Sequence, residues 1–286
     1  MTPLGPLALI LLSALLHAGW NALVKRCPDA RTATVGVLAV ATVAAAAAAL
    51  LGDAPAFATG RALALALAAG VFEGAYFATL GAALARSPLG VAYTIARGGA
   101  IVLVWPLSAA LFSEAVTPLG ASGAAVILGG LVLCALPALL GGARGGARGG
   151  VGFAVLCAAS IAGYHLCYKA ALAAGARPSP LFALSLAVAL PPNLVLLGAE
   201  RRRALVALFR TRAALVVLAG LVCTASFVVF LGALGGAGAG AVLTLRNTSV
   251  LFAQGFSILI GERPRRVEVI GAALVAVGAA LLGWPR

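Results

Sequence analysis

The chain has 286 residues, of which 63% are hydrophobic and 9% are charged, and its formal net charge is +13. Soluble domains are about 45–50% apolar and about 25% charged. This composition, with a mean hydropathy of +1.12, excludes a soluble globular protein and predicts an integral membrane protein. The positive charge does not predict nucleic-acid binding, because the basic residues lie mostly in short segments between apolar runs.

Apolar runs follow one another along the chain, each of about 20 residues, which is enough for a helix to span a bilayer. There are ten, at residues 4–24, 33–51, 62–85, 88–112, 118–140, 151–171, 179–198, 213–234, 238–260 and 267–284. The connections between them are short, so no additional soluble domain is expected.

Arginine and lysine are distributed unevenly between alternate loops. Fourteen basic residues lie in the loops that follow the first, third, fifth, seventh and ninth runs, which share one side of the membrane. Four lie on the other side. Because basic loops stay in the cytoplasm, both termini are predicted to lie outside. No basic residue precedes the first run, which favours a membrane helix over a cleaved signal peptide.

Two internal similarities relate the halves of the sequence. Segment 19–25, Gly-Trp-Asn-x3-Lys, is matched by segment 163–169, Gly-Tyr-His-x3-Lys, and Lys25 and Lys169 are the only lysines. A second match has a constant offset of 148, and pairs Phe112-Ser113-Glu114, Gly123 and Gly130 with Ile260-Gly261-Glu262, Gly271 and Gly278. Thr94 and Arg97 correspond to Thr244 and Arg246 if one residue is gapped. Internal repeats of this kind decide the fold.

Five spans per repeat is an odd number, so the second repeat enters the membrane the other way up. In transporters this arrangement places the substrate site near the membrane midplane. The predicted fold is therefore an all-α integral membrane protein of ten helices in two inverted five-helix repeats. The repeats cover residues 1–140 and 151–286, and a flexible Gly/Arg linker covers residues 141–150.

These features together resemble the EamA-like transporter family of the drug/metabolite transporter (DMT) superfamily. The resemblance rests on the five-plus-five runs, the aromatic-polar-Lys ends of the first and sixth, and the Gly-Glu turn before a Gly-x6-Gly run. It covers nearly the whole chain and departs where Ser113 stands in place of the expected glycine. The resemblance implies a central cavity lined mainly by runs 1, 3, 4, 6, 8 and 9, with export of a small metabolite.

Three ionisable residues lie deep in apolar runs, where a central charge costs about 2.5–3.5 kcal/mol and usually faces an interior cavity. Arg97 and Arg246 are near repeat equivalents. Each either faces the cavity, where its planar fork would hold a carboxylate or phosphate, or reaches the headgroups along its stem. Glu73 either pairs with one of them or stays protonated because burial disfavours its charged form, which would let it carry a coupling proton.

Further polar and aromatic residues share faces with these charges. His17, Asn21 and Lys25 form one stripe of a helix, and histidine can change charge near neutral pH, so His17 is a second proton-coupling candidate. Interhelical hydrogen bonding and interfacial anchoring remain alternatives for this stripe. The other predicted substrate-binding residues, beside Arg97, Arg246 and Glu73, are Trp20, Tyr76, Tyr93, Tyr164, His165, Asn247 and Gln254.

The predicted function is secondary active transport of a small polar solute by alternating access, with an anionic group on the solute favoured by the two arginines. A proton or a counter-substrate is the expected coupling partner, because the chain shows no nucleotide-binding motif. The five cysteines lack metal-ligand spacing, so no metal, cofactor or catalytic residue is predicted. Alternatives are a non-transporting sensor or scaffold and an intramembrane enzyme. The expected location is a bacterial cytoplasmic membrane.

Overall fold

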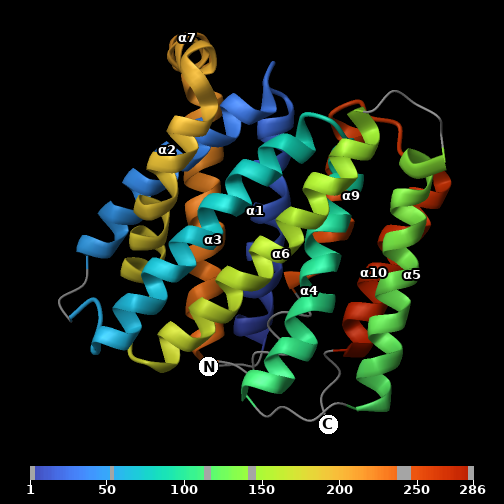
Figure 1. The fold of residues 1–286 in the computed structure, drawn as a ribbon, viewed down its shortest axis with the longest axis horizontal. Helices are drawn as coiled ribbons and strands as arrows, with labels where there is room; N and C mark the ends of the chain where they lie inside the picture. Colours follow the sequence, from blue (N-terminus) through green and yellow to red (C-terminus); the bar gives the residue numbers. More distant parts are fainter. Residues whose placement is uncertain (1–3, 52–54, 113–116, 141–145, 237–245, 283–286) are drawn as a thin grey trace.

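The computed structural model describes residues 4–51, 55–112, 117–140, 146–236 and 246–282, and within these ranges the ordered elements are α-helices, with one isolated β-bridge. The predicted all-α class is confirmed. Seven of the described helices are long and apolar enough to cross a membrane. The helices in Figure 1 are α1 (Leu4–Lys25), α2 (Ala30–Leu50), α3 (Gly60–Leu84), α4 (Leu89–Phe112), α5 (Pro118–Leu140), α6 (Gly146–Ala173), α7 (Pro178–Gly236), α9 (Ser249–Leu259) and α10 (Arg266–Leu282).

Helix α7 contains two of the predicted runs and is broken twice between them. The breaks are at Gly198, with φ 76° and ψ 166°, and at Arg212, with φ −137° and ψ 34°. Glycine adopts a positive φ without steric cost, which permits the first bend. The run boundaries predict a loop for the arginine-rich segment between the breaks, but this segment is helical and projects from one end of the molecule (Figure 1).

The helices pack in a regular pattern of neighbours. On one flank α2 packs against α7, and on the opposite flank α5 packs against α10 (Figure 1). In the middle α3 contacts α6 and α7, α1 contacts α7 and α9, and α4 contacts α6 and α9. Both termini lie at one end of the bundle, opposite the bend of α7 (Figure 1).

Glycines allow α5 and α10 to pack with their backbones in contact. A Cβ added at Gly123 would lie 2.6 Å from the carbonyl oxygen of Gly278, and one added at Gly278 would lie 2.6 Å from that of Gly123. Gly130 and Gly271 face each other in the same way, at 2.5 and 2.6 Å. These are the four glycines of the predicted second repeat match, and small residues are what close helix approach in a membrane requires.

The outer surface of the bundle carries large apolar side chains. Leu50, Leu51 and Leu259 are 86%, 87% and 79% exposed, and many other leucines and valines are exposed beside them. A monomeric soluble protein does not expose so much contiguous apolar surface, so this surface fits contact with lipid.

Part of the predicted linker is helical, because α6 begins at Gly146. A Cβ at Gly150 would clash with the hydroxyl of Ser87, so this glycine serves close packing against the α3–α4 turn rather than flexibility. The remaining linker residues, 141–145, lie outside the described residues. So do Ser113, Glu114, Thr244 and the first part of the predicted run 238–260.

Candidate functional site

All eleven predicted site residues are in the interior of the bundle, and none is more than 8% exposed. They come from elements that are far apart in sequence, namely α1, α3 and α4 in the first half of the chain and α6 and the 246–254 segment in the second half. We call the polar members the central cluster, namely His17, Glu73, Tyr93, Arg97, Tyr164, His165, Arg246, Asn247 and Gln254.

The two arginines of the central cluster face inward. Arg97 is 4% exposed and Arg246 is 2% exposed, so neither extends to the headgroup region. The guanidinium carbon of Arg246 lies 3.5 Å from the ring centroid of Phe230 and 4.9 Å from that of Phe227, and that of Arg97 lies 5.9 Å from the Tyr93 ring. An aromatic face attracts a cation, but it does not accept hydrogen bonds from the N–H groups of a guanidinium, which point outward in the plane of that group.

His17 connects the surroundings of the two arginines. Its Nδ1 lies 3.4 Å from Arg246 Nη2 and accepts from Trp20 Nε1 at 3.4 Å. Both of these neighbours are donor-only groups, so these two contacts are hydrogen bonds only when Nδ1 is the acceptor and the imidazole is neutral. Its ring centroid is 6.0 Å from that of Tyr93, which in turn contacts Arg97. The two guanidinium groups thus lie on either side of the His17–Tyr93 pair.

Glu73 hydrogen-bonds to a tyrosine rather than pairing with an arginine. Tyr168 on α6 donates to Glu73 Oε1 at 2.9 Å, and its hydroxyl also lies 2.6 Å from Ser185 Oγ. Within the described residues neither Arg97 nor Arg246 forms an ion pair with it. One oxygen of this fully buried carboxyl group, Oε2, has no hydrogen-bond partner there.

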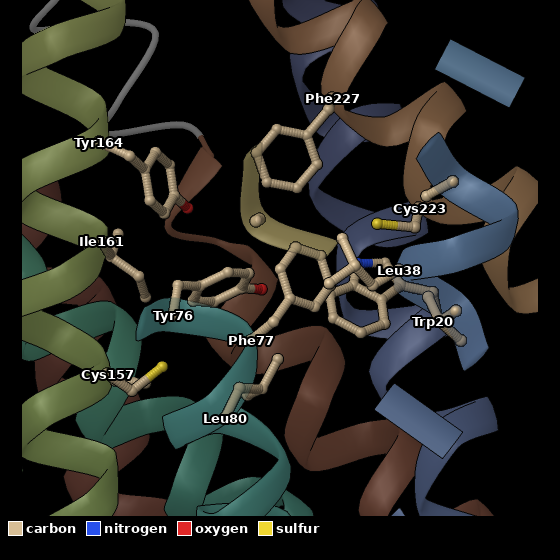
Figure 2. Close-up of a cluster of buried hydrophobic side chains, with 14 of the residues drawn as sticks. Trp20, Leu38, Tyr76, Phe77, Leu80, Cys157, Ile161, Tyr164, Cys223 and Phe227 are labelled. Carbon is tan, nitrogen blue, oxygen red and sulfur yellow. The ribbon is translucent and has the colours of Figure 1, made fainter. Parts of the chain in front are cut away.

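Aromatic rings form a wall between α1, α3, α6 and α7 (Figure 2). The Tyr164 ring lies 5.5 Å from Tyr76 and 6.2 Å from Phe227, and Phe77 lies 6.1 Å from Trp20, centroid to centroid. Trp20 is 0% exposed, so it packs in this wall and does not anchor the membrane interface. Rings at these distances make offset and edge-on contacts that fix the shape of the wall.

The central cluster leaves an unusual number of buried polar atoms without a hydrogen-bond partner among the described residues. The nitrogens are Arg97 Nε and Nη2, Arg246 Nε and Nη1, His165 Nε2 and Asn247 Nδ2, and the oxygens are Tyr93 Oη, Tyr164 Oη, Glu73 Oε2 and Gln254 Oε1. Buried polar groups are nearly always hydrogen-bonded, and leaving one unpaired costs about 1–3 kcal/mol. Such a concentration marks a place that a polar ligand or water fills.

Lys25 closes one end of the bundle. Its Nζ donates to the carbonyl oxygens of Leu84 and Ser87, at 2.6 and 2.7 Å, and lies 3.5 Å from Glu262 Oε1. Glu262 Oε2 accepts from the backbone N–H of Leu89 at 2.7 Å. The ends of α1, α3 and α4 and the α9–α10 turn are thereby joined. Lys169, its predicted repeat equivalent, is half-buried on α6.

Sequence reasoning misses several residues that the structure brings to the site. Tyr168 holds Glu73, the Ser226 hydroxyl lies 3.3 Å from His17 Nδ1, and Phe230 faces Arg246. For Tyr168, the sequence offers one sign of a place in the site, which is its position four residues after Tyr164 on the same helix face. In the sequence, Glu262 stands out only as part of a repeated turn.

No group of three or more His, Cys, Asp or Glu residues that could hold a metal ion occurs in the part of the chain that the structure describes.

Among curated proteins, a sequence search finds no match. One solved crystal structure, whose title gives no function, aligns with a TM-score of 0.61 over 97% of this chain and 98% of its own, at 20% sequence identity. This likeness concerns the fold alone. Residues 148–284 match the model of the EamA-like transporter family, which is part of the DMT superfamily, so the second half of the chain is similar to that family. The apolar helices and this match indicate a multi-pass membrane protein.

Proposed function

We propose that the protein is a secondary active transporter that binds a small polar solute in the central cluster and moves it by alternating access. The observation that carries this proposal is the set of unpaired polar atoms buried at the centre of a membrane helix bundle. Binding of a solute that pairs these atoms would recover the free energy that their burial costs. The match of residues 148–284 to a transporter family supports reading this site as a solute site.

Ten spans in two inverted repeats are part of this proposal, and the packing supports them. Exchanging α1–α5 with α6–α10, and treating the two long limbs of α7 as separate spans, maps several of the main helix contacts onto one another. The α3–α6 contact becomes that of α1 with the second limb of α7, and the α4–α6 contact becomes α1–α9. Gly123 faces Gly278 and Gly130 faces Gly271, which is the reciprocal pairing that a two-fold axis produces.

The arrangement fits a closed state of such a cycle. The central cluster is buried from solvent, and Lys25 with Glu262 joins four elements at one end of the bundle. By the distribution of basic residues, this end faces the cytoplasm of a bacterial cell. Opening it would require the Lys25–Glu262 contact to break while the other end stays closed.

Coupling to a proton or to a counter-substrate completes the proposal. Glu73 is the leading proton carrier, because it is a buried carboxyl group with one oxygen unpaired in the described structure. His17 is the second candidate and would have to lose its contacts with Trp20 and Arg246 before Nδ1 could take up a proton.

Flux through reconstituted vesicles tests the transport proposal. Liposomes with wild-type protein, loaded with a small-molecule extract, should release one class of solute faster than protein-free liposomes, as measured by mass spectrometry of the outside medium. Replacement of Arg97 by Gln should abolish this release. Arg202→Gln, which changes an exposed arginine of α7, is the matched control and should transport normally. Release that Arg97→Gln leaves unchanged, or no protein-dependent release of any solute, would contradict the proposal.

A further inference from the structure

We infer that the solute of the central cluster is a small dianion, such as a phosphoryl compound or a dicarboxylate, held between Arg97 and Arg246. The inference rests on the proposed function only in taking the central cluster as the solute site. It is carried by the charges and hydrogen-bonding groups that the site leaves unmatched.

The charges of the site do not balance without a ligand. Arginine stays protonated in proteins, so the site carries two positive charges. Both guanidinium groups are nearly fully buried, their contacts include aromatic faces and the His17 imidazole, and two nitrogens of each have no hydrogen-bond partner in the described structure. Among the described residues, the carboxyl group of the central cluster is that of Glu73, and it is bonded to Tyr168 instead. Uncompensated charges in a medium of low dielectric constant are strongly unfavourable, so the missing partner is negative.

The number of unpaired donors favours two negative charges over one. Four guanidinium nitrogens, two on each arginine, are without a partner among the described residues, and guanidinium nitrogens only donate. Tyr164 Oη and Asn247 Nδ2 add two further groups that can donate. A single carboxylate can occupy the fork of one arginine, whereas a phosphoryl group or a dicarboxylate presents enough oxygens and charge for both.

Glu73 fixes how the charges cancel. With a dianion between the arginines, the loaded site is neutral when Glu73 is protonated. Its proton then bonds within the site, while Tyr168 remains beside Oε1. A cation or a neutral solute would leave the two guanidinium charges unmatched in the same surroundings. The charge balance thus links the charge of the solute to the state of Glu73, because a monoanion would balance the site with ionised Glu73 and a dianion balances it with protonated Glu73. The number of unpaired donors selects the dianion, and the dianion in turn requires a protonated Glu73.

Methyl phosphate and methyl sulfate test the charge of the ligand directly, because they share a tetrahedral shape but differ in charge. At about pH 8 a phosphate monoester carries close to two charges, since its second pKa is about 6. Thermal unfolding of the purified protein in detergent is followed against each compound and against tetramethylammonium, up to about 10 mM, where even weak ligands stabilise measurably. Methyl phosphate should reach half-maximal stabilisation at a concentration at least about tenfold lower than methyl sulfate.

Arg97→Gln and Arg246→Gln should each raise that concentration about ten- to a hundredfold, because each removes a charged hydrogen-bonding partner. Arg202→Gln should leave it unchanged. If a Gln variant does not fold, Arg97→Lys and Arg246→Lys keep the charge and should keep the preference for methyl phosphate at weaker affinity. A short-chain phosphatidate is an additional arm that separates a lipid headgroup from a soluble anion.

Equal stabilisation by methyl phosphate and methyl sulfate, stabilisation by tetramethylammonium alone or by phosphatidate alone, or no stabilisation by any probe would overturn the inference. So would a response to methyl phosphate that the arginine replacements leave intact. Failure of the transport proposal looks different. In that case methyl phosphate binds through the arginines, yet no solute crosses the vesicle membrane. Protein-dependent flux of an uncharged solute without dianion binding would refute the inference and leave transport standing.

Discussion

At the scale of single residues, some buried polar groups in and around the central cluster have hydrogen-bond partners, and others have none among the described residues. Tyr164 and Tyr168 illustrate the difference, because they lie one helical turn apart on α6 and both are fully buried. The Tyr168 hydroxyl bonds to Glu73 and Ser185, whereas the Tyr164 hydroxyl has no partner in the described structure. The first therefore contributes to stability, and the second is available to a ligand.

Tyr168→Phe should lower the free energy of unfolding by about 1–3 kcal/mol, because it leaves the buried Glu73 Oε1 without its donor. Tyr164→Phe removes a hydroxyl with no partner in the described residues and should change stability by much less. The melting temperatures of both variants, measured in the same detergent without ligand, check this. Equal losses in the two variants would show that the Tyr168–Glu73 hydrogen bond contributes nothing.

Much of the site is predictable at this scale. An arginine or glutamate within an apolar run is expensive unless it faces an interior, so the sequence favours inward positions for Glu73, Arg97 and Arg246, and the structure selects these over headgroup contact for the two arginines. Their partners do not follow in the same way, because hydrogen bonds such as Tyr168 to Glu73 join residues 95 positions apart and depend on how α3 and α6 are rotated. Whether Glu73 meets Tyr168 or an arginine depends on the rotation of the helices about their axes, which the composition of the sequence does not determine.

At the scale of helices, the α5–α10 pair is held by backbone contact rather than by large side chains. Gly130→Ala should destabilise the protein strongly, because the new Cβ would lie 2.5 Å from the carbonyl oxygen of Gly271 and force the helices apart. Gly129→Ala is the matched control, since nothing lies within 4 Å of its Cβ position, and alanine favours a helix by up to about 1 kcal/mol. Thermal unfolding of the two variants should move in opposite directions. A loss of stability in both would point to backbone flexibility instead.

Helix boundaries show where sequence reasoning works and where it stops. The repeat spacing of Gly123, Gly130, Gly271 and Gly278 points to an equivalent role, and the structure pairs these four glycines. The glycine-rich stretch before α6 is typical of a linker, yet helix starts at Gly146, because glycines there allow α6 to approach the α3–α4 turn. Composition alone does not separate a glycine needed for flexibility from one needed for close packing.

At the scale of the whole molecule, Lys25 and Glu262 couple the first helix to the α9–α10 turn. Glu262→Gln removes the ion pair and weakens the acceptor of the Leu89 N–H, so the α3–α4 turn should open more often. Hydrogen–deuterium exchange should become faster in peptides that cover residues 84–92. Peptides around Ala58, whose N–H bonds to Gly175 at the opposite end, should exchange as in the wild type. Faster exchange at both ends would indicate general unfolding.

The predicted orientation also belongs to this scale. Alkaline phosphatase, which folds only outside the cytoplasm, should be active when fused after Arg286 and inactive when inserted into the bend of α7 between residues 199 and 211. Both fusions report on ends of the bundle that Figure 1 places opposite each other. The reverse pattern of activity would show that the termini face the cytoplasm.

The Lys25–Glu262 contact has a consequence for biosynthesis. Lys25 ends α1, but its carboxylate partner lies 237 positions later, beyond α9, and is therefore synthesised much later. The ammonium group therefore has to remain near water, at the cytoplasmic border in the proposed orientation, while nearly all of the protein is made. Only when the α9–α10 hairpin inserts is Lys25 paired and this end of the bundle closed, so a truncated chain that lacks α9 and α10 should be recognised by the cell as incomplete.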